Sequence, residues 1–272
     1  MELVGYTLMA LVASGLGALG GLGGAVLLVP ALVVTGMPAA EAAPLGLLTV
    51  AAGSIAAGPH QLSERSVNHR LGITTELFAS AGAVVGAIAS GLVSDRALPW
   101  LLAGVALAAA GVGARRKGLR NPPDPECEYS DVGERVDSLA GAYPLGGGVV
   151  PYWPRRVGSG LGFMGVAGLV AGSAGASGGF IKTPATSELM GVPMKVAAAT
   201  TTFTVGITSS AALIVFALQG RIDVENGAVV IVGSLLGGQL GARVQSRMPP
   251  TTIRAVLTAL LVTVAVVLVI RA

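Results

Sequence analysis

Lys182 is a basic residue inside a long apolar stretch, and several hydroxyl side chains accompany it in the sequence. These hydroxyls belong to Ser177, Thr183, Thr200, Thr201 and Thr202. An ionisable residue at membrane depth is a functional candidate, because a charge is costly to keep there. A cation with neighbouring hydroxyl donors could bind a small anion. The alternative is a lysine that extends its amine to the membrane surface, which the nearby Pro184 would favour.

Two glycine-rich segments, each followed by a proline, could place backbone donors beside such an anion. Gly23-Gly24 precede Pro30, and Gly178-Gly179 precede Pro184. Clustered glycine and proline weaken a helix, and hydrocarbon cannot satisfy the freed backbone groups, so a break persists only against protein or a wet cavity. A helix that begins at such a break presents unpaired N–H groups and a partial positive charge to an anion. The simpler alternative is that these glycines only permit close helix packing.

Glu76 is a carboxyl that follows Thr74-Thr75 in a third apolar stretch. Burial raises the pKa of a carboxyl towards neutrality, so Glu76 is a candidate carrier of a coupling proton. The alternative is a residue near the membrane surface, one or two helical turns inside.

Enzyme chemistry has no support in the sequence. We find no Gly-x-Ser-x-Gly elbow, no His-Glu-x-x-His and no paired intramembrane aspartates, so no catalytic residues are predicted. The chain has one cysteine, Cys127, and no His/Cys cluster at metal-ligand spacing. The sequence therefore predicts no metal site and no cofactor.

The composition predicts an all-α integral membrane protein. Of 272 residues, 53% are hydrophobic and only 11% are charged, whereas soluble domains carry about 25% charged residues. A membrane-spanning helix needs about 20 mostly apolar residues. Uncharged stretches of that size cover 3–40, 42–63, 77–94, 97–114, 157–181, 196–220, 226–242 and 255–270. The lipid bilayer is the expected partner, and nucleic acid is not, because the basic residues lie at the ends of apolar stretches.

The two halves of the chain resemble one another. Gly36-Met37-Pro38 matches Gly191-Val192-Pro193 at a spacing of 155 residues, and further matches share that register. We therefore predict two four-helix repeats, 1–114 and 157–272, which together supply about eight transmembrane helices. The first helix of each repeat is expected to be broken at its glycine-rich segment. Residues 115–156, rich in charge and proline, form a polar linker between the repeats.

Four crossings per half would place both termini and the linker on the same side of the membrane. Most basic residues would then lie on that side, which the positive-inside rule makes cytoplasmic. This assignment makes the repeats parallel. Arg96, Arg243, Arg247 and Arg254 would face the other side. An inverted repeat would need one glycine break to turn back into the membrane rather than cross it, and the sequence leaves that open.

The two glycine-rich segments resemble the signatures of the TauE/SafE sulfite exporter family. The resemblance rests on Gly21 to Pro30 in the first half, and on Gly178 to Pro184 followed by Met190 to Thr200 in the second. Ala25 and Ser177 stand where that family usually has a third glycine. The resemblance implies a plasma-membrane carrier of a small sulfur-containing anion, such as sulfite or an organosulfonate.

We therefore expect a secondary transporter that holds its anion where the two broken helices meet. The predicted binding residues are Gly23, Gly24, Pro30, Ser177, Gly178, Gly179, Lys182, Thr183, Pro184, Thr200 and Thr201. Leu28 and Ala40 occupy the places in the first half that match Lys182 and Lys195, so the site should be asymmetric. The alternatives are an uncoupled anion channel or permease, or a membrane scaffold that transports nothing. The oligomeric state stays open and includes a homo-oligomer.

Overall fold

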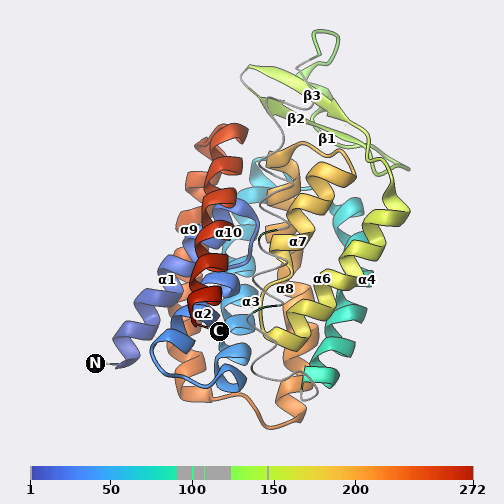
Figure 1. The fold of residues 1–272 in the computed structure, drawn as a ribbon. Helices are drawn as coiled ribbons and strands as arrows, with labels where there is room; N and C mark the ends of the chain where they lie inside the picture. Colours follow the sequence, from blue (N-terminus) through green and yellow to red (C-terminus); the bar gives the residue numbers. More distant parts are fainter. Residues whose placement is uncertain (1, 91–99, 101–106, 108–123, 146, 272) are drawn as a thin grey trace.

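The computed structural model describes residues 2–90, 100, 107, 124–145 and 147–271, and these are mostly helical (Figure 1). Six helices in the described residues are long and apolar enough to cross a membrane. They are α1 (Glu2–Gly20), α3 (Ala39–Ser63), α4 (His69–Ala89), α6 (Val157–Ala174), α8 (Met194–Leu218) and α9 (Val224–Arg247). The stretch 97–114, expected to be a fourth span of the first half, lies almost wholly outside the described residues.

Further helices complete the bundle. They are α2 (Ala25–Val34), α7 (Gly179–Pro184) with a π-helical turn at Ala185–Leu189, and α10 (Pro250–Arg271). Side chains and prolines fix where the longer helices begin. Asn68 caps α4 by accepting from the Leu71 N–H, and Asp223 caps α9 in the same way. Pro38 and Pro193 stand immediately before α3 and α8, where a missing N–H costs nothing.

Glycine allows the longer helices to pack backbone against backbone. At Gly168 a Cβ atom would lie 2.9 Å from the Ala83 nitrogen, and at Gly82 it would lie 3.0 Å from the Leu169 nitrogen, so α4 and α6 touch through their main chains. Gly237 and Gly241 bring α9 equally close to α1. Small residues at such contacts are typical of helices that associate within a membrane.

The same contacts give the directions of the helices. Successive glycines of α9 meet successive turns of α1, so these two helices run the same way; the pairs are Gly233 with Thr7, Gly237 with Leu11, and Gly241 with Gly15. By the same reasoning α3 runs in the same direction as α9, because Gly53 lies against Gly238 and, further along both helices, Gln61 donates a hydrogen bond to Gln245. Helices α4, α6 and α8 run in the opposite direction (Figure 1).

The structure places the start of α1 and the linker at opposite ends of the bundle, which differs from the expectation that they lie on one side of the membrane. The linker ends where α6 begins, beside the junction of α3 and α4, whereas α1 starts beside the opposite end of the bundle (Figure 1). The reason is that α2 returns towards the end at which α1 began. Helices α1 and α6, which open the two predicted halves, consequently run in opposite directions, whereas a parallel repeat requires them to run the same way. Arg243 and Arg247, at the end of α9, lie at the linker end rather than opposite it.

The linker contains a small sheet that the sequence did not predict. Strands β1 (Gly133–Glu134), β2 (Gly141–Leu145) and β3 (Gly148–Tyr152) pair antiparallel in that order. Asn68 joins the sheet to the helices, because its side-chain amide donates to the Leu139 carbonyl at 2.9 Å and to the Tyr152 hydroxyl at 3.0 Å. The sheet therefore covers the α3–α4 end of the bundle.

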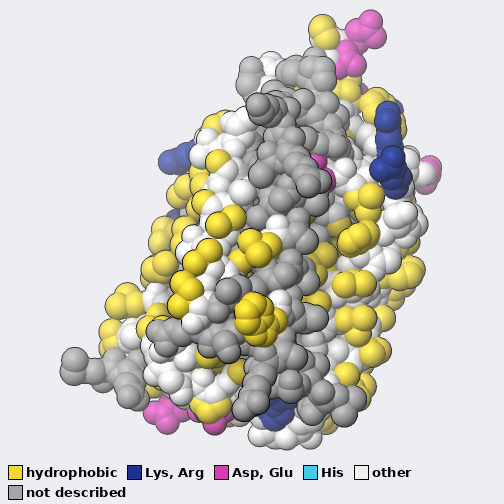
Figure 2. Space-filling view, viewed as in Figure 1, with side chains coloured by type: hydrophobic (Ala, Val, Ile, Leu, Met, Phe, Trp, Pro, Cys, Tyr) yellow, Lys and Arg dark blue, Asp and Glu magenta, His cyan; other side chains and the backbone are white. Residues whose placement is uncertain are grey.

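The surface matches a bundle that spans a membrane. On the face drawn in Figure 2, hydrophobic side chains lie on both sides of the grey residues along the middle of the molecule, and the charged side chains in view lie towards its two ends. Exposed apolar residues of α3, α4 and α8 include Ile55, Leu77 and Ile214, each more than 60% exposed. Such side chains suit a hydrocarbon environment rather than water.

Candidate functional site

The chain segments that interrupt the helices lie against one another inside the bundle. Residues 21–24 separate α1 from α2, and residues 175–178 separate α6 from α7. The Ser177 hydroxyl donates to the Leu22 carbonyl, and the Thr183 hydroxyl donates to the Gly21 carbonyl at 3.1 Å. Side chains from the second interruption and from α7 therefore satisfy backbone carbonyls of the first interruption, as a membrane interior requires.

Glycine is needed at this meeting point for two physical reasons. Gly21 and Gly23 adopt φ values of 71° and 72°, which residues with a Cβ rarely take. Gly179 approaches the backbone so closely that a Cβ atom would lie 2.7 Å from the Leu22 carbonyl oxygen. The glycines therefore allow both the turn and the contact.

Lys182 carries a buried charge next to this contact. Its side chain is 2% exposed, and its Nζ donates to Glu76 Oε2 at 2.6 Å and to Thr208 Oγ1 at 2.8 Å. The Thr208 hydroxyl in turn donates to Glu76 Oε1. Helices α4, α7 and α8 thus contribute one member each to a closed group of three, which we call the Glu76–Lys182–Thr208 cluster. Neither charged side chain reaches the surface of the helix bundle.

The cluster is electrically balanced but leaves a neighbouring hydroxyl unpaired. Glu76 and Thr208 are 3% and 0% exposed, so little water screens the pair. Ser80 follows Glu76 by one helical turn on the same face of α4, and its buried hydroxyl has no hydrogen-bond partner. An unpaired buried hydroxyl is unfavourable and marks a place where a further polar group could bind.

The other predicted residues are buried, except for the partly buried Gly23, but they do not all converge on Lys182. Gly23 lies against Ser177, and Gly24 lies against Thr49. Pro30 and Pro184 are buried inside α2 and α7. Thr200 accepts a hydrogen bond from the Asn68 N–H at 3.0 Å, two helical turns from Thr208 and towards the linker end, and Thr201 is buried beside it.

A family comparison agrees with this geometry. The family model described as Sulfite exporter TauE/SafE matches residues 6–268. The chain belongs to this family. It is also 21% identical over 271 residues to the "Probable membrane transporter protein YunE" of Bacillus subtilis (strain 168), a match that covers 96% of this chain and 95% of the relative. No solved structure gives a significant match. The resemblance seen in the two glycine-rich signatures is confirmed, and this TauE/SafE protein is a multi-pass membrane transporter.

Thr208 is the member of the cluster that the sequence analysis missed. A signal was present, because Thr200, Thr204 and Thr208 recur every four residues and so share one face of α8. That face lies against α4, where Thr204 contacts Gly72 and Thr208 contacts Glu76. Among the threonines of α8, the one that bonds to Lys182 is therefore Thr208 rather than the predicted Thr200 or Thr201.

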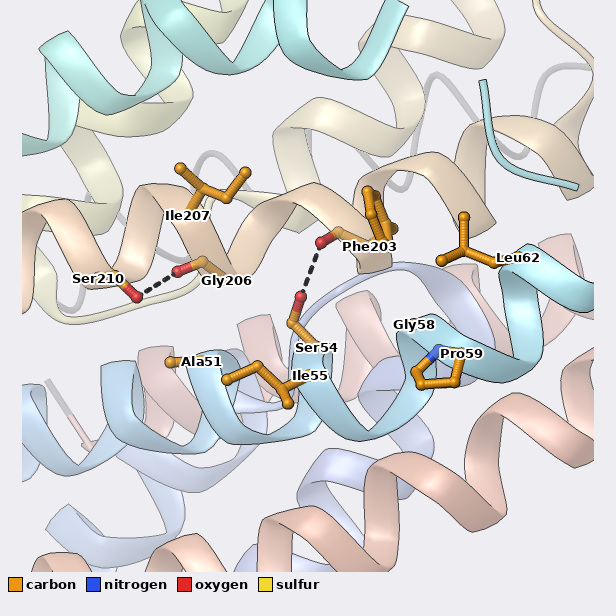
Figure 3. A pocket seen from close by; sticks show the side chains of 10 residues that line it. All are labelled: Ala51, Ser54, Ile55, Gly58, Pro59, Leu62, Phe203, Gly206, Ile207 and Ser210. Atoms are coloured by element: carbon orange, nitrogen blue, oxygen red, sulfur yellow. Dashed lines mark hydrogen bonds between the residues drawn. The ribbon is translucent and has the colours of Figure 1, made fainter. Parts of the chain in front are cut away.

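A separate pocket of about 500 Å³ opens between α3 and α8 of this TauE/SafE protein (Figure 3). Its walls are mainly apolar and include Ile55, Phe203 and Ile207, and its polar side chains bond to the backbone. The Ser54 hydroxyl donates to the Phe203 carbonyl at 2.9 Å, and Ser210 donates to Gly206 at 2.8 Å. None of the predicted binding residues lines it, and the lining offers no charge to an anion.

Proposed function

We propose that the protein is a secondary transporter that moves a small sulfur-containing anion, such as sulfite or an organosulfonate, across the plasma membrane. Family membership supports transport, and the family description names sulfite. The anion would be held where residues 21–24 meet residues 175–178, with Lys182 as its cation. The observation that carries the proposal is a buried lysine next to two interrupted helices. A charge and unpaired backbone groups are both costly inside a membrane, so both features together mark a functional site.

We further propose that the chain consists of two inverted four-helix repeats, which together supply about eight helices in the membrane. In each repeat the broken first helix would turn back and the other three would cross, so that the two ends of a repeat lie on opposite sides. The matching helices α1 and α6 run in opposite directions, as do α3 and α8. In addition, α1 of the first half packs against α9 of the second, and α4 of the first half packs against α6 of the second, and glycines make both contacts. Inverted repeats with interrupted helices at their interface are a common design of secondary transporters. The first helix of each repeat would be the broken one, so rocking one repeat against the other would expose the site to each side in turn.

The distribution of basic residues supports an orientation. Among the residues whose side chains the structure describes, the linker end of the bundle carries Arg65, Arg70, Arg135, Arg155, Arg156, Lys195, Arg243 and Arg247, whereas Arg221 lies at the other end. The positive-inside rule then places the linker sheet in the cytoplasm and the start of α1 outside.

A carrier is favoured over an uncoupled channel, because the predicted binding side chains are closed off from solvent. Ser177, Lys182, Thr183, Thr200 and Thr201 are each at most 4% exposed. A closed site surrounded by packed helices fits a carrier that must change conformation to release its anion.

The test is counterflow of radiolabelled sulfite and methanesulfonate into vesicles that contain the purified protein. A carrier exchanges labelled anion for a large internal pool of unlabelled anion, and it shows saturation. Flux that does not respond to internal anion would indicate a channel. If neither anion enters faster than into protein-free vesicles, the sulfur-anion proposal fails and a scaffold becomes the better interpretation.

A further inference from the structure

The Glu76–Lys182–Thr208 cluster leaves no charge on Lys182 for an incoming anion. Glu76 already accepts from Lys182 Nζ at 2.6 Å and neutralises it, and both side chains are buried. An anion added to the intact pair would bring one uncompensated charge into a poorly solvated space, which is strongly unfavourable. Something must leave or be neutralised before an anion binds.

We propose that the anion takes the place of Glu76 as the partner of Lys182, and that Glu76 takes up a proton when it is displaced, so that anion and proton cross together. This inference rests on the proposed transport function and assigns its coupling ion. The empty site holds a carboxylate and an ammonium group. The loaded site holds a carboxylic acid, the same ammonium group and the anion. For a monoanion the net charge of the site is zero in both states, which suits a buried position.

The alternatives cost more. A displaced Glu76 that stayed ionised would be a buried carboxylate without its cation, which is strongly unfavourable. A protonated Glu76 instead becomes neutral and can donate a hydrogen bond. The unpaired Ser80 hydroxyl, one turn away on the same face of α4, supplies a polar partner beside the exchange.

No other charged group of the described helices that pack against Glu76 can take over its role. Helix α6, which packs along α4, carries no charged residue. The lysine of α8, Lys195, bonds to the Ser246 carbonyl at the linker end of the bundle, more than three helical turns from Thr208. Helix α7 contributes only Lys182. Within these elements, Glu76 and Lys182 are therefore each other's charged partner.

The experiment uses full-length protein in vesicles, with valinomycin and potassium to set the membrane potential independently of the pH gradient. The probes are radiolabelled methanesulfonate, which stays a monoanion throughout the pH range, and sulfite. An acidic exterior should drive accumulation of methanesulfonate at zero potential, and potential alone should not. The apparent KM should fall by up to about tenfold for each pH unit of external acidification until Glu76 is fully protonated.

Glu76→Gln separates coupling from binding. The amide resembles the protonated carboxyl and leaves Lys182 free, so the variant should retain counterflow, lose the pH dependence of KM and no longer accumulate anion in a pH gradient. Glu41→Gln, at an exposed carboxyl in the first turn of α3, should behave like the wild type. Lys182→Gln should abolish counterflow. If that variant fails to fold, Glu76→Gln/Lys182→Gln removes both charges and should fold without counterflow.

The outcomes separate this inference from the transport function. Wild-type counterflow that ignores the pH gradient, or pH-driven accumulation that survives in Glu76→Gln, overturns the exchange and leaves a sulfur-anion transporter in place. Counterflow that survives in Glu76→Gln/Lys182→Gln also overturns it, because the anion then does not bind at Lys182. Absence of flux for both anions in the wild type removes the proposed function and this inference with it.

Discussion

Lys182 and Glu76 are 106 positions apart in the chain, yet their charged atoms are 2.6 Å apart in the folded protein. A buried pair of this kind adds little net stability, because the loss of hydration offsets the attraction. The loss of one partner is a different matter, since it leaves the other charge buried and unpaired. The pair is therefore better explained by function than by stability.

This difference predicts a non-additive pair of substitutions. Lys182→Met should lower the free energy of unfolding by about 3–5 kcal/mol, because Glu76 is left without its cation. Glu76→Leu/Lys182→Met should recover most of that loss, because no buried charge remains. Thermal unfolding in detergent would measure both variants. Lys195→Met, which removes a half-buried lysine bonded to the Ser246 carbonyl, should cost only about 1 kcal/mol. Equal losses in the single and double variants would contradict the argument.

At the residue scale, the sequence identifies the charged members of the site but not their partnership. Lys182 stands out because its surroundings are apolar, and Glu76 stands out for the same reason. That they meet depends on the register between α4 and α8, where Gly72 faces Thr204 and Glu76 faces Thr208. One sequence carries no information on such a register, because many small residues along both helices would permit neighbouring alignments.

At the scale of elements, close glycine contacts hold α4 against α6. In α6, Gly168 lies against the backbone of Ala79 and Ala83, whereas Gly162 is exposed and a Cβ atom there would meet nothing within 4 Å. These two glycines share one helix but differ in their surroundings. They therefore form a matched pair for testing the packing.

Gly168→Ala should destabilise the protein by about 1–3 kcal/mol, because the added methyl group would push α6 away from α4. Gly162→Ala should be neutral or stabilise by up to about 1 kcal/mol, because alanine favours a helix and meets no obstacle. The thermal midpoints of the two purified variants in one detergent would measure this difference. An unchanged midpoint for Gly168→Ala would show that α4 and α6 are not in backbone contact.

The linker sheet depends on a buried phenol. Burial raises the pKa of Tyr152 to about 12, against an ordinary value of 10.0. A raised pKa means that the folded state favours the neutral phenol, so the stabilisation is complete below pH 10 and is lost as the pH rises through 12. The loss amounts to about 3 kcal/mol. Tyr152→Phe should remove this part of the pH dependence between pH 10 and 12, measured by thermal unfolding at each pH, and an unaltered dependence would argue against it.

For the glycine-rich segments, the sequence predicts that the helix is interrupted but not the direction that the chain takes afterwards. Their composition indicates a weak helix, and the chain does leave its helical path between Gly20 and Ala25. Composition does not indicate whether the chain then crosses or turns back. That depends on what receives α2, and here Val29 and Ala25 pack against Gly46 of α3, which holds α2 alongside α3 and reverses the chain.

At the scale of the whole molecule, that reversal decides the topology. Treating 3–40 as one crossing places the N-terminus beside the linker, but α1 followed by a returning α2 places it at the opposite end. The reversal in the first half moves the following loops to the other end of the bundle relative to the N-terminus, and the reversal in the second half moves the loops after α7 back. The positive-inside rule still applies, although the basic residues now fall into different groups.

The topology can be tested with two cysteines of equal exposure at the two ends of the bundle. Val136 in the linker and Val224 at the start of α9 are 77% and 78% exposed. The chain has one native cysteine, so Cys127→Ser provides a background without thiols. In intact cells a membrane-impermeant maleimide should label Val224→Cys, and it should label Val136→Cys only after permeabilisation, because the linker end carries most of the basic residues of the described bundle. Labelling of Val136→Cys alone in intact cells would invert the orientation. Labelling of both, or of neither, would place the two ends on one side and refute the helix directions on which the inverted repeat depends.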